Sequence, residues 1–144
     1  MAGPEDLIRE ARIWLRRHGG NLYHLWPYVL AARQGFQRKL PRMAAYHAKA
    51  VEVAAALSAL PGIALTPNPP HTNMMHVFLK GDSERLLAVR DRIARERKIF
   101  LFNRLSPCQL PGYAMTEITI VDGGLEFEPA EVKALFEDLL VMDL

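Results

Sequence analysis

The stretch PGIALTPNPPHTNMMHVFLKGD, residues 61–82, marks the point where the hydrophobic pattern changes from helical to alternating. Its prolines remove backbone donors and force a turn between two extended segments, residues 63–66 and 72–80. The side chains of the longer segment alternate between two faces, with Met75, Val77 and Leu79 on one and Met74, His76 and Phe78 on the other. We therefore expect two strands of a sheet that is at least half covered on both faces.

Helical periodicity surrounds these two strands. The predicted helices cover residues 4–18, 22–38, 41–60, 82–98 and 129 onward. Further strands are expected at residues 99–102 and 116–121, with an irregular loop at 103–112 and a turn at 122–124. This order predicts an α+β fold: a mostly antiparallel sheet of about four strands covered by helices, with a helical arm at the N-terminus.

The composition is that of a soluble globular domain. The chain has 144 residues, of which 50% are hydrophobic and 24% are charged, and its formal net charge is +2. This charge is too small to predict nucleic-acid binding, and no apolar stretch is long enough to predict a membrane span. Because the single cysteine cannot form an internal disulfide and the first six residues do not resemble a signal peptide, we expect a cytoplasmic protein.

The second predicted helix is apolar on nearly all of its surface up to Arg33. Such a helix is normally buried on most sides, and one small domain offers limited cover for it. We therefore expect the segment that begins at Leu22 and ends at Phe36 to contact a partner, either a second copy in a homo-oligomer or a further domain.

Residues with metal-binding or nucleophilic chemistry do not form a motif. None of the five histidines has the spacing of a metal-binding motif, so no metal site is predicted. Cys108 lies in a proline-containing loop and is interpreted as an unpaired cysteine; the alternative, a nucleophile, requires a neighbouring base. The arginines of residues 85–98 alternate with acidic side chains, which favours a solvated, ion-paired helix face.

The run Arg16-Arg17-His18-Gly19-Gly20 allows two interpretations. Glycine amides next to basic side chains can approach an anion, because glycine tolerates positive φ. The same residues also form an ordinary helix C-terminus with basic groups at the negative end of the dipole. The spacing alone favours the second interpretation and leaves the first open as an anion-binding regulatory role.

Four segments, in this order, carry a resemblance to a known family: residues 18–28 (HGGNLYHLWPY), 40–43 (LPRM), 69–74 (PPHTNM) and 117–122 (EITIVD). Together they resemble the C-terminal part of the threonine aldolase and aromatic amino acid β-eliminating lyase family, over nearly the whole chain. The resemblance implies a fold-type-I pyridoxal-phosphate enzyme. Residues 1–40 would be a helical arm that links to a large domain absent from the chain, and residues 41–144 would be the small C-terminal α+β domain.

The resemblance also implies a reaction. Enzymes of this family are usually homo-oligomers that cleave β-hydroxy-α-amino acids to glycine and an aldehyde, through a lysine Schiff base with pyridoxal phosphate. None of the five lysines here has the family's Ser-x-x-Lys-like setting. We therefore expect no catalytic residue, no covalently bound cofactor and no activity of this chain alone, with an amino-acid substrate only in the full-length context. The alternative is a stand-alone dimerisation or binding module derived from the same fold.

Candidate site residues follow from the same resemblance. Those expected to contact the cofactor phosphate or a subunit interface are Arg17, His18, Gly19, Gly20, Asn21, Tyr23 and His24. Family aldolases place an arginine in the late strand to pair with the substrate carboxylate, but the matching residues 114–118 contain none. Arg104, in the preceding loop, is the expected substitute.

Overall fold

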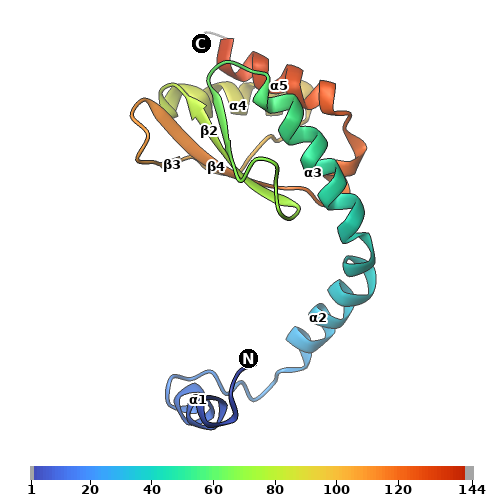
Figure 1. Ribbon diagram of the computed structural model, residues 1–144, viewed down its shortest axis with the longest axis vertical. Coiled ribbons are helices and arrows are strands. Elements are labelled where there is room, and N and C mark those ends of the chain that lie inside the picture. The colour runs from blue at the N-terminus through green and yellow to red at the C-terminus, as the bar shows by residue number, and fades with distance from the viewer. Residues whose placement is uncertain (1, 142–144) are drawn as a thin grey trace. The chain divides into compact units, whose positions relative to one another are not determined.

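The computed structural model describes residues 2–141 (Figure 1). The chain divides into two units, one up to Pro41 and one from Arg42 onward. Among the described residues, no helix is both long enough and apolar enough to cross a membrane.

The first unit contains α1 (Glu5–Arg17) and α2 (Trp26–Arg38). Helix α1 follows Pro4 and carries acidic residues in its first turn and basic residues in its last, which suits the helix dipole. Helix α2 begins four residues later than the predicted start at position 22. Pro27 explains this difference, because proline has no backbone N–H and fits only in the first turn of a helix. Neither helix has a buried residue.

The 3₁₀ turn η1 (Leu40–Arg42) spans the boundary between the two units, and α3 (Met43–Ser58) follows it, where one continuous helix was predicted. A four-stranded sheet follows, made of β1 (Ile63–Thr66), β2 (Met74–Lys80), β3 (Ser106–Pro107) and β4 (Tyr113–Thr119). The strand order is β1-β2-β4-β3, and every neighbouring pair is antiparallel. The predicted α+β class with an antiparallel sheet is therefore confirmed.

The register of the sheet separates its two faces. Val77 pairs with Thr116 and Leu79 with Ala114, and these side chains are buried under the helices. His76 pairs with Glu117 on the opposite face, which is only partly covered. Because side chains alternate along a strand, this register gives the sheet one core face and one face that we call the open face.

Helices α3, α4 (Ser83–Arg97) and α5 (Pro129–Val141) cover the core face (Figure 1). Leu57, Leu86 and Leu139, one from each helix, are fully buried in a single hydrophobic cluster with the sheet. Asp82 caps α4 as predicted, because its carboxylate accepts a hydrogen bond from the amide of Arg85 at 2.9 Å.

The second half of the chain departs from the sequence-based predictions in the places and bounds of its strands and in its last turn. Residues 99–102 form no strand, although they are apolar; the strand is Ser106–Pro107, inside the predicted irregular loop. At the end of this segment the Arg90 guanidinium donates to the carbonyl oxygens of Phe102 and Asn103, so these two oxygens bond to a side chain and not to a neighbouring strand. Strand β4 covers 113–119 instead of 116–121, and the turn after it is the 3₁₀ helix η2 (Asp122–Glu126).

Candidate functional site

The open face of the sheet carries a mainly polar hollow of about 390 Å³. Strands β2 and β4 and the loop before β3 supply its walls. The lining residues are His76, Asn103, Arg104, Ser106, Met115, Thr116 and Glu117. Arg104, the predicted substrate contact, thus lies in a hollow that also holds an imidazole and a carboxylate.

His76 and Glu117 face each other across two strands of this hollow. They are direct partners in the β2–β4 register, and the Nε2 of His76 lies 3.9 Å from an oxygen of Glu117. The hydroxyl of Thr119 donates to the other oxygen of Glu117 at 3.4 Å. Both side chains of the pair are more than a third exposed, so their mutual attraction is weak and leaves both groups able to bind a ligand.

Arg104 makes no hydrogen bond or ion pair with any other residue from 2 to 141, and it is exposed. Its position depends on Arg90 in α4, which donates to the carbonyl oxygens of Phe102 at 3.2 Å and Asn103 at 2.5 Å. The Arg90 guanidinium also pairs with Asp91 at 2.6 Å. Arg90 therefore fixes the backbone next to Arg104, while the Arg104 guanidinium stays available to an anion.

The chemistry of this hollow suits a small zwitterion. A guanidinium pairs well with a carboxylate, in a bidentate geometry that an ammonium group cannot match. The carboxylate of Glu117, in turn, attracts an ammonium group. Sequence reasoning found Arg104 through the resemblance but assigned no role to Glu117, and the cross-strand pairing with His76 requires the β2–β4 register.

The predicted residues of the first unit lie at the end of α1 and in the segment after it. The amide of Gly20 donates to the carbonyl oxygen of Leu15 at 2.8 Å, and the amide of Gly19 donates to that of Arg16 at 3.3 Å. These two hydrogen bonds, with Gly19 at φ +73°, terminate helix α1. Both glycine amides are therefore already used inside the chain, so an anion here would depend on side chains.

The side chains around these glycines are exposed. The Arg17 guanidinium lies 5.1 Å from the ring centre of Trp14, and the ring of His18 stacks on the same indole at 5.6 Å. The rings of Tyr23 and His24 meet edge to face at 4.8 Å, and Asn21 lies in the same irregular segment. Among these residues, His18 lines a shallow apolar groove along α1.

A polar cluster that sequence reasoning missed joins Arg42, Tyr46 and Asp122. Both the Arg42 guanidinium and the Tyr46 hydroxyl donate to the carboxylate of Asp122, although Tyr46 itself is buried. The hydrogen bond to Asp122 is the main cause that raises the pKa of Tyr46. This cluster ties η2 to the start of α3; Asp122 is 80 residues from Arg42 and 76 from Tyr46, so no local motif shows it.

Other reactive groups of the second unit have structural partners. The thiol of Cys108 is free of any disulfide and lies 3.2 Å from the carbonyl oxygen of Tyr113. His47 bonds to the carbonyl oxygen of Pro70 at 3.0 Å. Residues 2–141 contain no group of three or more histidine, cysteine or acidic side chains that could hold a metal ion.

Two solved structures are similar to this chain. One, from Exiguobacterium sp. 255-15, is provisionally described as an aromatic amino acid β-eliminating lyase/threonine aldolase; it is 32% identical, with a TM-score of 0.78. The other, from Listeria monocytogenes EGD-E, is provisionally described as an L-allo-threonine aldolase; it is 28% identical, also with a TM-score of 0.78. Each match covers 96% of this chain, which spans only 39% and 38% of those proteins. No protein-family model and no curated protein matches the chain.

Proposed function

We propose, from the confirmed similarity of this chain to the threonine aldolase and aromatic amino acid β-eliminating lyase family, that it works as the C-terminal portion of a carbon–carbon lyase. The proposed reaction is the cleavage of a β-hydroxy-α-amino acid to glycine and an aldehyde, with pyridoxal phosphate as the cofactor that the resemblance implies. The contribution of the chain is to bind the substrate carboxylate through Arg104. The observation that carries this role is the unpaired Arg104 guanidinium in a hollow with Glu117 and His76.

The described residues by themselves do not fit pyridoxal phosphate. The cofactor requires a lysine for its Schiff base, and no lysine lines the five best-defined hollows among residues 2–141. Lys49 bonds to a backbone carbonyl and pairs with Glu52, and Lys98 closes α4. The glycine amides that were expected near the phosphate are already bonded. We therefore propose that the 144 residues alone do not form the cofactor site and are inactive alone.

The carboxylate role of Arg104 is consistent with the chemistry of β4. The strand that carries an arginine in the aldolases carries Glu117 here, so the strand cannot pair with a carboxylate. Arg104 enters the same hollow from the loop and restores a cation there. An amino acid in this hollow would place its carboxylate at Arg104 and its ammonium group towards Glu117.

Titration with glycine, followed by the backbone amide NMR shifts of β2 and β4, tests this role. We expect shifts around His76 and Glu117 that glycinamide, which lacks the carboxylate, does not produce. The variant Arg104→Met should abolish them, whereas Arg95→Met, on the exposed end of α4, should keep them. Equal shifts with glycine and glycinamide, or binding retained in Arg104→Met, would overturn the proposed role.

The cofactor claim has a separate test. Pyridoxal phosphate is added to the chain, and the absorbance of a lysine Schiff base is sought at about 420 nm. The mixture is then treated with borohydride, which traps such an adduct. We expect no stoichiometric trapped adduct. A trapped adduct on any of the five lysines would contradict the proposed inactivity and leave the carboxylate role untouched.

A second candidate function, a stand-alone dimerisation module, is favoured by the apolar surface of the first unit. Trp26 is 63% exposed and Phe36 is 70% exposed, and α2 has no buried residue. We propose a homo-oligomer through the segment from Leu22 to Phe36. Light scattering should show a multimer that the double variant Trp26→Ser, Phe36→Ser converts to a monomer. A wild-type chain that stays monomeric at high concentration would refute the proposed oligomer.

We also propose a cytoplasmic location, which suits the free thiol of Cys108.

A further inference from the structure

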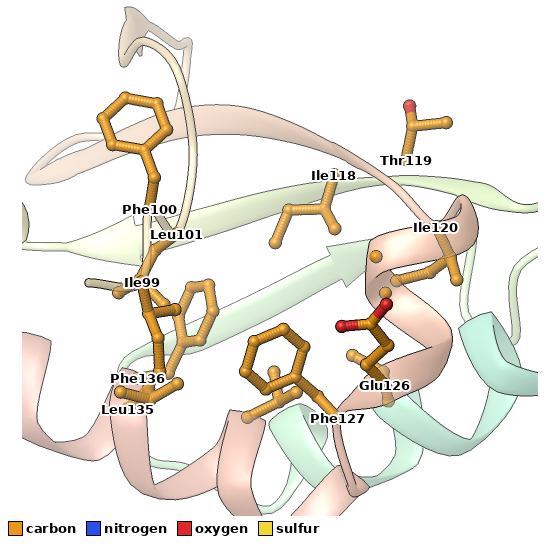
Figure 2. A pocket seen from close by; sticks show the side chains of 14 residues that line it. Ile99, Phe100, Leu101, Ile118, Thr119, Ile120, Glu126, Phe127, Leu135 and Phe136 are labelled. Atoms are coloured by element: carbon orange, nitrogen blue, oxygen red, sulfur yellow. The ribbon is translucent and has the colours of Figure 1, made fainter. Parts of the chain in front are cut away.

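A second hollow, of about 340 Å³, lies between the end of β4, η2 and α5 (Figure 2). Ile118 lines it from the core face of the sheet, whereas Glu117 lines the hollow of Arg104 from the open face. The two hollows therefore lie on opposite faces of β4. Buried side chains, among them Val53 and Phe136, form the floor of this second one, which we call the apolar pocket.

The rim of the apolar pocket is more polar and more exposed than its floor. Thr119 and Glu126 are exposed there, and Phe100 is 60% exposed and extends away from the floor. In Figure 2 the carboxylate of Glu126 lies between Phe127 and Ile120. The pocket thus has an apolar interior with a single carboxylate near its mouth.

Glu126 is the one charged residue that lines the pocket, and it has no hydrogen bond or ion pair with another residue of the described chain. Nearby cations have other partners. The ammonium group of Lys49 donates to the carbonyl oxygen of Phe127 at 3.3 Å but pairs with Glu52, also at 3.3 Å. Arg90 lies over the ring of Phe100 at 5.0 Å and pairs with Asp91. The charge that the pocket offers to a ligand is therefore negative.

The wall of the pocket on the η2 side is kept bare by glycine. A Cβ atom added at Gly123 would meet no other atom within 4 Å, so this position borders open space. The available volume is larger than the roughly 150 Å³ that accommodates a benzene ring in an apolar protein cavity. A ligand with one aromatic ring and a short side chain fits this size.

The geometry points to the apolar pocket as a binding site for a small primary amine that carries an aromatic ring. The ammonium group pairs with Glu126, and the ring packs against Phe127 and Phe136, in a floor whose side chains exclude water. This site is independent of the proposed lyase role, since it involves neither Arg104 nor a cofactor.

Three probes of similar size and different charge test this site on the full chain: 2-phenylethylamine, 2-phenylethanol and 3-phenylpropionate. Dissociation constants are measured by titration, and the amide NMR shifts of Gly123, Gly124 and Phe127 report the place of binding. We expect the amine to bind about fivefold more tightly than the alcohol, the value of a partly exposed ion pair, and the acid to bind more weakly than the alcohol.

Two variants and one control separate charge from shape. Glu126→Gln should bring the amine to the affinity of the alcohol and leave the alcohol unchanged, whereas Glu128→Gln, outside the pocket lining, should keep the difference. Gly123→Val should weaken the binding of the amine and of the alcohol alike, because the valine side chain fills part of the pocket. An unchanged melting temperature would show that this variant is folded. Equal binding of amine and acid, a preference for the amine that survives Glu126→Gln, shifts confined to amides elsewhere, or no binding of any probe would each overturn the proposal.

Discussion

The two units of this protein contain similar apolar side chains, but these are buried in the second unit and exposed in the first. In the second unit, Leu57, Leu79 and Leu139 are completely buried between sheet and helices. In the first unit, Leu7, Leu25 and Leu30 are each more than half exposed, and neither helix has a buried residue. Because an apolar side chain stabilises a fold only when it leaves water, the second unit has a hydrophobic core of its own, whereas the apolar side chains of α1 and α2 gain little from burial within the first unit.

The largest expected effect on stability comes from shortening a buried leucine of the second unit. Leu57→Ala should destabilise the chain by about 2–5 kcal/mol, because it leaves a cavity in the core. Leu30→Ala, the same change on α2, should cost less than about 0.5 kcal/mol in a monomeric chain. Urea unfolding at low protein concentration measures both. Equal losses would show that the apolar surface of α2 is covered within the monomer.

Removal of Arg90 should have the next largest effect. Arg90→Met leaves the carbonyl oxygens of Phe102 and Asn103 without their donor, at a cost of about 1–3 kcal/mol in unfolding free energy. The same variant should weaken the glycine titration at Arg104, because the loop loses its anchor. Arg33→Met, in α2, is the matched control, since Arg33 has no hydrogen bond or ion pair with another residue from 2 to 141. A variant as stable as the control would refute the anchor role.

The helix caps sharpen the comparison at a smaller scale. Asp82 accepts a hydrogen bond at the start of α4, whereas Pro4, at the start of α1, provides no side-chain cap. Asp82→Ala should cost about 1 kcal/mol, and Asp82→Asn should recover most of it because asparagine caps equally well. Chemical unfolding of the two variants decides this. No difference between them would mean that the cap contributes nothing to stability.

The smallest expected effect is a pH dependence. The hydrogen bond to Asp122 raises the pKa of Tyr46 above the ordinary value of 10.0, so folding favours the protonated phenol. The stability from this bond is fully present below pH 10 and is lost as the pH rises through the raised pKa. Melting temperatures between neutral and alkaline pH should fall less steeply in Tyr46→Phe than in the wild type. Identical alkaline slopes would contradict the assignment.

Local patterns predicted the elements whose signals are short-range. The alternation around Val77, the cap at Asp82 and the helix from Pro129 onward all have their cause within a few residues. Errors arose where a distant residue decided the structure. Residues 99–102 are as apolar as a strand but form none, and the carbonyl oxygen of Phe102 bonds to the side chain of Arg90 in α4. Pro27 could have predicted the later start of α2, because a proline fits only in the first turn, so the helix does not begin several residues before it.

Some residues of the candidate sites were predicted from the sequence, and others became evident only in the structure. Arg104 was predicted from the resemblance, and the structure places it in a hollow with His76 and Glu117. The resemblance also pointed to Gly19 and Gly20, whose amides the structure shows bonded to the end of α1. The apolar pocket around Glu126 had no counterpart in the sequence reasoning, because its lining comes from four separate parts of the chain.

The sequence by itself determined the α+β class, the order of the main helices and strands, and the resemblance to a lyase family, since periodicity and short motifs are properties of neighbouring residues. Only the tertiary structure decided which loop carries the third strand, which side chains share a hollow, and where a charge has no partner. Those properties depend on contacts between residues far apart in the chain, such as His76 and Glu117 across β2 and β4, which no local pattern encodes.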